Sequence, residues 1–398
     1  MRMSIPAGSL VITNGRVLLP SGKLEPCDVR IEGGCVVAMG QGLAADEQVN
    51  VTGAYVLPGL IDLHTHGIGY ESTTAQTLHR YAQLEAAHGA TTFYPTLFGS
   101  PDQGIQHMER HRQSSAEFRL LPQVGGFRLE SPYLAQTGAG LSRDLAPISA
   151  ETTEALLAAG GGHIKIWDVS PELPGAVDLI GRLSGDGIVC SLAHTQATIE
   201  QARAAVDAGA RLVTHLFDTF VLPPIVDPGV YPAGLVDYLL TEDRVTCEII
   251  GDGTHVPPIL VEKALRCKTP GRLAWVTDSN FGAALPPGEY NAPGWGWIVV
   301  DGANHGARLR DRQMVLAGSA LTPIDAFRNA IRLFHRDMAT ASQLCSGTPA
   351  RLMGLNKGEI AAGRDADLII LDAELNLLHT IVAGQIAYAA SEPSSRSE

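Results

Sequence analysis

Short apolar runs broken by turn residues characterise both ends of the chain. Between residues 9 and 57, runs of strand length such as Leu10–Ile12 and Val36–Met39 alternate with turns, among them Asn14-Gly15. Residues 366–388 repeat this pattern, with a turn at Gly384. We therefore expect the two ends, although far apart in sequence, to pair into one small β-sandwich.

The middle of the chain has a different pattern. Apolar runs of strand length alternate there with longer stretches of helical period, which is what a parallel sheet with crossover helices requires. Helices are predicted over residues 73–87, 153–159, 176–183 and 199–207. Eight strands are predicted, and they end near His64, Pro95, Glu130, Lys165, His194, His215, Gly251 and Asp278. Eight such alternations predict an α/β fold, a TIM-like (β/α)8 barrel.

The predicted domain organisation follows from these patterns. Residues 1–57 form the first part of the β-sandwich, residues 58–353 form the barrel, and residues 354–391 form the second part of the β-sandwich. The last residues, 392–398, have the composition of a frayed tail.

Composition narrows the class of partner. Of the 398 residues, 45% are hydrophobic and 18% are charged, as in folded globular proteins. The formal net charge of -13 has the wrong sign for neutralising the phosphates of nucleic acid. The six cysteines form no CxxC pair, which favours a reduced, cytoplasmic setting. No apolar run is long enough to cross a bilayer. We expect a small-molecule substrate, with neither nucleic acid nor a membrane as a partner.

Histidines and carboxylates stand where predicted strands end, and this is the face on which such barrels carry their active sites. His64 and His66 are two positions apart, so on a strand they point the same way and can reach one metal ion. Further strands are closed by Glu130, His194, His215 and Asp278. Imidazole and carboxylate together suit zinc or a similar divalent ion. A converging set of this kind predicts a metal site rather than unrelated structural histidines.

The motifs around these residues resemble the amidohydrolase superfamily and, within it, the N-acetylglucosamine-6-phosphate deacetylases. The resemblance rests on motifs spread over almost the entire chain, in the family's order. They are Pro58–Gly67 (PGLIDLHTHG), Leu129–Pro132 (LESP), Thr214–Phe217 (THLF), Gly251–Val256 (GDGTHV), Val276–Asp278 (VTD), Leu316–Thr322 (LAGSALT) and Gly363–Leu368 (GRDADL).

The resemblance implies a metal ion bound by Glu130, His194 and His215. Some relatives hold a second ion with the HxH pair, here His64 and His66, so one or two ions are expected, with zinc, iron or manganese as the metal. It also implies that Asp278 assists the second ion and acts as the general acid and base, and that His255 contacts the substrate. In other branches of the superfamily a carboxylated lysine bridges the metals. Lys165 is the corresponding residue, and we interpret it as structural because Glu130 already supplies a bridge. The superfamily commonly forms homodimers.

The positions that would bind the substrate depart from the family pattern. Phe217, Asp218 and Thr219 follow His215, and the family's phosphate-binding arginine is replaced within Val226–Gly229. Arg128 stands where relatives carry a histidine. By strand period it points to the same side as Glu130 and could bind a substrate carboxylate or phosphate, or it could be buried and paired with a barrel acid. The loop that contains Trp295 and Trp297 could cover the pocket, or Trp297 could belong to a strand core.

The sequence therefore predicts a metal-dependent amidohydrolase that removes an N-acyl group, most simply acetyl, from an amino-sugar-like substrate. One alternative is an amidohydrolase acting on another C–N bond, that of an N-acyl amino acid or a cyclic amide. A second alternative is a non-catalytic barrel with a binding role, for which metal ligands should have been lost.

Overall fold

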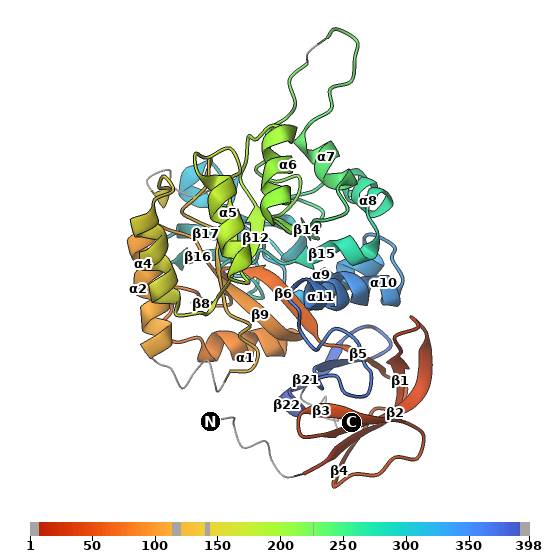
Figure 1. Cartoon of the computed structure of the whole chain (residues 1–398). Helices are drawn as coiled ribbons and strands as arrows, with labels where there is room; N and C mark the ends of the chain where they lie inside the picture. Colours follow the sequence, from red (N-terminus) through yellow and green to blue (C-terminus); the bar gives the residue numbers. More distant parts are fainter. Residues whose placement is uncertain (1–7, 114–120, 140–143, 226, 391–398) are drawn as a thin grey trace.

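The computed structural model describes residues 8–113, 121–139, 144–225 and 227–390, so the predicted tail 392–398 lies outside the described residues. The chain forms a barrel of parallel strands surrounded by helices, with a separate β-sheet packed below one end (Figure 1). Within the described ranges, none of the helices has the length and apolar character needed to cross a bilayer.

Eight parallel strands form the barrel, as predicted. Their hydrogen-bonded order follows the sequence, and a parallel bridge between Thr65 and Ser279 joins the last strand to the first. Every residue of β9 is buried, because helices cover the outer face and side chains fill the inside. The strands are β6 (Leu60–Thr65), β9 (Ala90–Leu97), β10 (Phe127–Leu129), β11 (Ile164–Val169), β12 (Val189–Leu192), β13 (Leu212–Val213), β14 (Thr246–Ile250) and β15 (Leu273–Val276).

Helices connect these strands on the outside. α6 illustrates why they begin where they do: Thr198 Oγ1 accepts a hydrogen bond from the Gln201 amide, and the Gln201 side chain accepts one from the Thr198 amide. The helices are α1 (His79–Ala87), α2 (Pro101–Gln113), α4 (Ala150–Gly160), α5 (Ala176–Gly185), α6 (Ile199–Ala208), α7 (Leu235–Thr241), α8 (Pro258–Cys267), α9 (Pro323–Arg332), α10 (Met338–Ser342) and α11 (Thr348–Leu352), with a π-helical turn, η5 (Gln343–Gly347), before α11.

One predicted strand end was wrong. β11 continues to Val169, four residues beyond Lys165, because Trp167 and Val169 are fully buried and extend the apolar run. Lys165 instead lies near the start of the strand, where its Nζ donates to the carbonyl of Gly162. The side chain of Lys165 therefore lies at the amino end of the barrel strands and not at the carboxyl end, where the other candidates lie.

The two ends of the chain pair with each other, as predicted for the small β-sandwich, and their strands form one mixed sheet. β5 (Tyr55–Pro58) pairs antiparallel with β20 (Leu368–Leu371), which joins the first segment to the last. The order is β22-β21-β20-β5-β1-β2-β3, and β4 pairs with β1. The remaining strands are β1 (Leu10–Leu18), β2 (Leu24–Glu32), β3 (Cys35–Gly40), β4 (Glu47–Asn50), β21 (Leu377–Val382) and β22 (Gln385–Ala389).

The predicted turn at Asn14-Gly15 was wrong, because β1 runs through it. The register with β2 shifts between Ile12 and Gly15, and Asn14 adopts a positive φ of 62°, so these residues form a bulge. A β-carbon at Gly15 would lie 2.7 Å from Cγ2 of Val56. The turn-like dipeptide thus serves close packing against β5.

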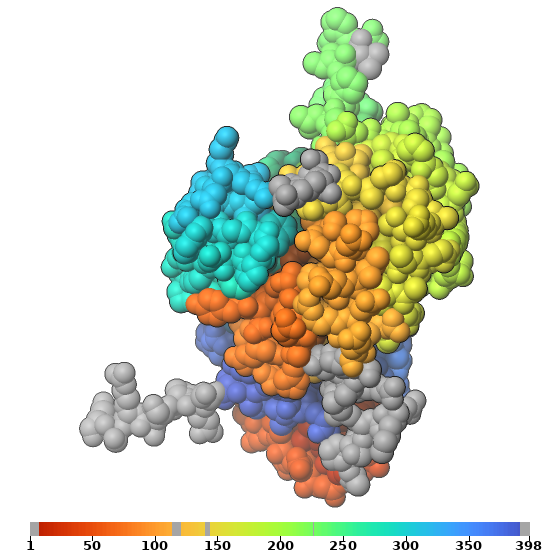
Figure 2. All heavy atoms as spheres, turned by 90° about the vertical axis from the view of Figure 1, so that its left-hand side faces the viewer, coloured from red at the N-terminus to blue at the C-terminus, as the bar shows by residue number. Residues whose placement is uncertain are grey.

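A small antiparallel sheet follows the last barrel strand, and this segment of the chain forms a lobe at one side of the molecule (Figure 2). It consists of β16 (Gly288–Ala292), β17 (Gly296–Val300), β18 (Ala307–Leu309) and β19 (Val315–Leu316). The predicted aromatic loop is therefore mostly a hairpin, with Trp295 in its turn. Trp297 lies in β17 with a relative exposure of 36% and its ring under Arg310 at 4.6 Å, so it is not core. A shorter hairpin, β7 (Gly67–Ile68) with β8 (Glu71–Ser72), follows β6.

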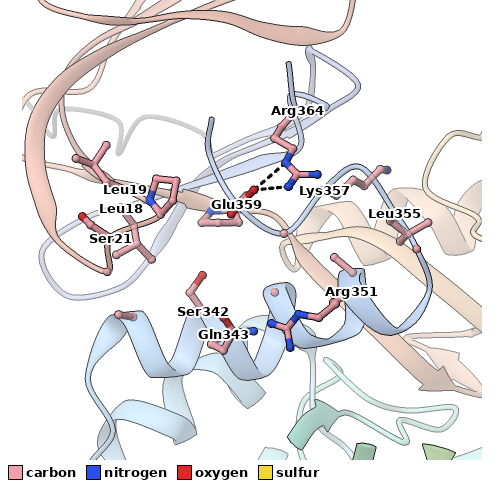
Figure 3. A pocket seen from close by; sticks show the side chains of 18 residues that line it. Leu18, Leu19, Ser21, Ser342, Gln343, Arg351, Leu355, Lys357, Glu359 and Arg364 are labelled. Atoms are coloured by element: carbon pink, nitrogen blue, oxygen red, sulfur yellow. Dashed lines mark hydrogen bonds and ion pairs between the residues drawn. The ribbon is translucent and has the colours of Figure 1, made fainter. Parts of the chain in front are cut away.

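A cavity of about 600 Å³ separates the terminal sheet from the barrel (Figure 3). It lies between the β1–β2 turn, the segment from α10 to α11 and the chain that leads to β20. Its charged side chains all have partners: Arg364 pairs with Glu359, Lys357 pairs with Asp367, and Arg351 donates to the carbonyl of Gly271. We interpret this junction cavity as a packing gap between two parts of one chain.

Candidate active site

The six predicted metal ligands come together at the carboxyl ends of the barrel strands, and all six are buried. Three of them lie two residues beyond the end of a strand and adopt positive φ angles that are uncommon for residues other than glycine: 45° at His194, 24° at His215 and 48° at Asp278. Backbone conformations of this kind persist where the surrounding structure requires them, often at functional sites. Here they turn the chain so that each side chain points across the barrel mouth.

Glu130 lies at the centre of the cluster and contacts a pair of histidines with each carboxylate oxygen. Its Oε1 is 2.9 Å from Nε2 of His194 and 3.4 Å from Nε2 of His215. Its Oε2 is 3.0 Å from Nε2 of His66 and 3.4 Å from Nε2 of His64. The cluster therefore contains two overlapping groups of three donors that share Glu130.

Asp278 completes the second group. Its Oδ1 lies 3.3 Å from Nε2 of both His64 and His66, and these two Nε2 atoms are only 3.2 Å apart. The ring of His66 is oriented from behind, because its Nδ1 lies 3.1 Å from the carbonyl oxygen of Thr96. Orientation by a backbone carbonyl is common for metal-binding histidines.

The electrostatics of the cluster favour positive charge beside its two carboxylates. Burial opposes the charged form of His66, yet its hydrogen bonds to Asp278 and Glu130 raise its pKa to about 10. Burial likewise opposes the charge of Asp278, but the surrounding histidines lower its pKa to about 2. A divalent cation would supply this positive charge directly. Since the donors are imidazole nitrogens and carboxylate oxygens that converge in a buried site, they fit one or two divalent ions.

A pocket of about 400 Å³ opens over the cluster. Of the predicted site residues, it is lined by His66, Glu130, His194, His215, Asp218, Thr219, His255 and Asp278. His64 lies deeper and is fully buried. Phe217 is not among the lining residues and packs instead against the hydrophobic core.

His255 faces this pocket from the loop after β14. Its Nδ1 is 2.7 Å from Oδ2 of Asp252, whose other oxygen accepts the backbone amides of Thr254 and His255. Burial opposes its charge, but the hydrogen bond to Asp252 raises the pKa of His255 above its ordinary value. With Nδ1 engaged by Asp252, Nε2 is the atom that can act on a ligand.

Arg128 does not reach the pocket, which corrects its assignment as a substrate-binding residue. It is fully buried beneath the cluster, where it forms ion pairs with Asp168 at 3.1 Å and with Glu248 at 2.5 Å. It also donates to the carbonyl of Leu63 and to Thr214 Oγ1. The second interpretation, a buried arginine paired with barrel acids, describes this arrangement. Because all its nitrogens have protein partners, none is left for a ligand.

Sequence reasoning missed several residues that line the pocket. Phe98, which follows β9, packs near Trp295 with a ring distance of 6.2 Å, and Trp295 in turn lies 6.4 Å from the ring of His66. Asn280 and Arg308 also line it. The alternation of Ala307, Arg308 and Leu309 could have indicated that Arg308 points away from its two apolar neighbours. It could not have indicated that Arg308 points toward the pocket.

Comparison with known proteins agrees with this geometry. The pattern of the amidohydrolase family matches residues 55–387. The chain is 31% identical to N-acetylglucosamine-6-phosphate deacetylase of Lysinibacillus sphaericus, over 95% of this chain and 97% of the relative. It is 28% identical to N-acetylgalactosamine-6-phosphate deacetylase of Escherichia coli O157:H7, over 95% of this chain and 99% of the relative.

Solved structures agree as well. A mutant N-acetyl-D-glucosamine-6-phosphate deacetylase of Mycobacterium smegmatis, in complex with N-acetyl-D-glucosamine-6-phosphate, superposes with a TM-score of 0.84 at 30% identity. The similarity covers 95% of this chain and 99% of that one. The likeness therefore extends over the terminal sheet as well as the barrel.

Proposed function

Because the chain belongs to the amidohydrolase family, a family of metal-dependent hydrolases acting on C–N bonds, we propose that it removes the acetyl group from an N-acetylated amino sugar. The observation that carries this proposal is the complete cluster of four histidines and two carboxylates at the floor of the 400 Å³ pocket. The deacetylase names of the relatives support the acetyl group and the amino sugar.

Two groups of side chains would hold the metal. Glu130, His194 and His215 would bind one ion, and His64, His66 and Glu130 would bind a second one, with Asp278 beside it. Zinc is the first ion to test, and iron and manganese suit similar donors. When bound, a divalent ion supplies a water molecule of lowered pKa and polarises the carbonyl of the amide.

The protein's own groups then move the protons. Asp278 accepts a proton from the water as the new C–O bond forms, and it later gives this proton to the leaving nitrogen as the C–N bond breaks. The surrounding histidines lower the pKa of Asp278, so its carboxylate is ionised, which is the form that can accept a proton. In its protonated form, which the hydrogen bond to Asp252 favours, His255 donates a hydrogen bond from Nε2 to the acyl oxygen, where negative charge develops. The products are acetate and the free amino sugar.

The test measures metal content and acetate release on the same preparation. N-acetylglucosamine, with and without a 6-phosphate, is the first substrate pair, and N-acetyl amino acids and cyclic amides are the second panel. Acetate release from an amino sugar that depends on added metal supports the proposal. Release confined to the second panel would replace it with the other C–N hydrolase, and a metal-free protein inactive on every compound would favour a binding role.

We also propose that the protein forms a homodimer in a cytoplasmic setting. The segment between β13 and α7 extends away from the barrel and exposes large apolar side chains, with Leu222 at 86% and Tyr231 at 84% relative exposure (Figure 1). Exposed apolar side chains gathered in this way typically mark an interface. Six free cysteines support a reducing compartment. Light scattering of the wild type and of a Leu222→Ser, Tyr231→Ser variant tests the dimer, and a monomeric wild type would refute it.

A further inference from the structure

Arg308 occupies a distinct place in the wall of the pocket. It lies in the middle of β18, between Ala307 and Leu309, which are both buried in the core of the small sheet. Because successive side chains of a strand point to opposite faces, Arg308 points away from that core. It pairs across the ladder with Leu316, and cross-strand partners share a face. Both residues line the pocket that contains Glu130 and Asp278.

The guanidinium of Arg308 is held in place but not neutralised. Its Nη1 donates to the carbonyl of Met314 at 2.9 Å, which ties the side chain to the next turn. In the part of the chain that the structure describes, it forms no ion pair with a carboxylate. The neighbouring Arg310 differs, because it pairs with Glu289 at 2.7 Å and with Asp311 at 3.1 Å. Arg308 therefore keeps donors that can serve a ligand.

Charge distribution makes this position selective. Among the described lining residues, Arg308 is the only arginine or lysine, while Glu130, Asp218 and Asp278 carry carboxylates. The metal cluster accounts for Glu130 and Asp278. Asp218 would repel an anion placed beside it, so an anionic part of a ligand is favoured near β18 instead. Arginine binds phosphate and carboxylate through two parallel hydrogen bonds, which adds direction as well as strength.

We infer that Arg308 forms an anion-binding subsite of the reaction pocket, which holds a phosphate or carboxylate substituent of the substrate while the acetamide lies at the metal cluster. This inference rests on the proposed deacetylase function and adds the residue that selects a charged substrate over a neutral one. The phosphate in the names of the relatives supports a phosphate as the substituent. Arg308 acts in specificity and takes no part in the proton transfers.

The experiment compares kcat/KM for acetate release from a neutral and two charged sugars by the metal-loaded protein. The probes are N-acetylglucosamine, its 6-phosphate and N-acetylmuramic acid, so that phosphate and carboxylate are distinguished. Arg308→Gln is expected to lower the preference for the charged over the neutral sugar roughly 10- to 100-fold, mainly through KM, because it removes charged hydrogen bonds. Arg308→Lys should recover part of this preference. Arg310→Gln is the matched control and should retain the preference of the wild type.

The outcomes separate the subsite from the reaction. Equal preference in Arg308→Gln and Arg310→Gln, or a wild type that favours the neutral sugar, overturns the subsite and leaves the deacetylase intact. If no sugar releases acetate, the deacetylase proposal fails, and inorganic phosphate is titrated against tryptophan fluorescence, since Trp295 lines the same pocket. Phosphate binding that weakens in Arg308→Gln but not in Arg310→Gln then supports the subsite, and equal binding overturns it.

Discussion

Two hollows in the part of the chain that the structure describes differ in their lining, and the larger of these two is not the better candidate for chemistry. The junction cavity between the terminal sheet and the barrel measures about 600 Å³, and the pocket over the metal cluster about 400 Å³. In the junction cavity, Arg351, Lys357 and Arg364 each have a protein partner. In the pocket, imidazoles and carboxylates crowd together, and Arg308 has no acid partner among the described residues.

This difference indicates that the kind of side chains lining a hollow, rather than the volume of the hollow, marks the candidate functional site. Folding tends to pair charges that have no other role, because an unpaired charge away from water is costly. Imidazoles and carboxylates that converge, as around Glu130 and Asp278, fit a cation that is not part of the chain. Substitutions in the two regions should therefore have different effects.

The largest expected effect follows from loss of the metal. His194→Ala removes a donor that lies 2.9 Å from Glu130, so the protein should lose metal and nearly all turnover. Elemental analysis measures the metal, and acetate release measures the turnover. Treatment of the wild type with a chelator should give the same inactive state, and added divalent metal should restore only the wild type. Full metal content in His194→Ala would show that the ligand set is wrong.

Asp278→Asn tests the proton carrier separately from the metal. The amide cannot accept the proton of the water, so kcat should fall by about 10²- to 10⁴-fold. Metal content and the melting temperature should change little, because Asn keeps the shape of the side chain. Near-normal turnover in this variant would remove Asp278 from its proposed role.

Arg128→Met tests a charged residue beneath the pocket that does not face it. The substitution leaves Asp168 and Glu248 buried without their cation, so we expect a loss of about 3 to 5 kcal/mol in the free energy of unfolding. Urea denaturation measures this change. Arg182→Met is the matched control, because its partner Glu154 is exposed and such pairs contribute about 0 to 1 kcal/mol. Equal stability of the two variants would contradict the structural role of Arg128.

The smallest effect is expected in the junction cavity. Arg364→Gln breaks the half-exposed pair with Glu359, so the free energy of unfolding should fall by no more than about 1 kcal/mol. The kcat/KM for acetate release should equal that of the wild type, because this cavity lies apart from the metal cluster. A change in KM of more than a few fold would show that the junction cavity communicates with the reaction pocket, and the contrast between the two hollows would fail.

Sequence patterns predicted the barrel, the joined ends and the six candidate metal ligands, because each depends on local order. Strand and helix periods are properties of short segments, and a residue at the carboxyl end of a barrel strand must lie at the mouth of the barrel. His64 and His66 share a face for the same reason. The bulge at Asn14 and the extension of β11 escaped prediction, because turn residues and charged residues are typical of strand ends, whereas packing continues the strand at both places.

What the sequence alone determined was therefore the chemistry available and the face on which it stands. The tertiary structure decided which charged side chains pair with other groups of the protein and which are left to contact a ligand. Arg128 is paired with residues 40 and 120 positions away, and no local pattern shows such partners. Arg308 faces the pocket because β18 lies in a sheet beside the barrel mouth. Both outcomes depend on segments that only folding brings together, since the pairing of a charge is set by its neighbours in space.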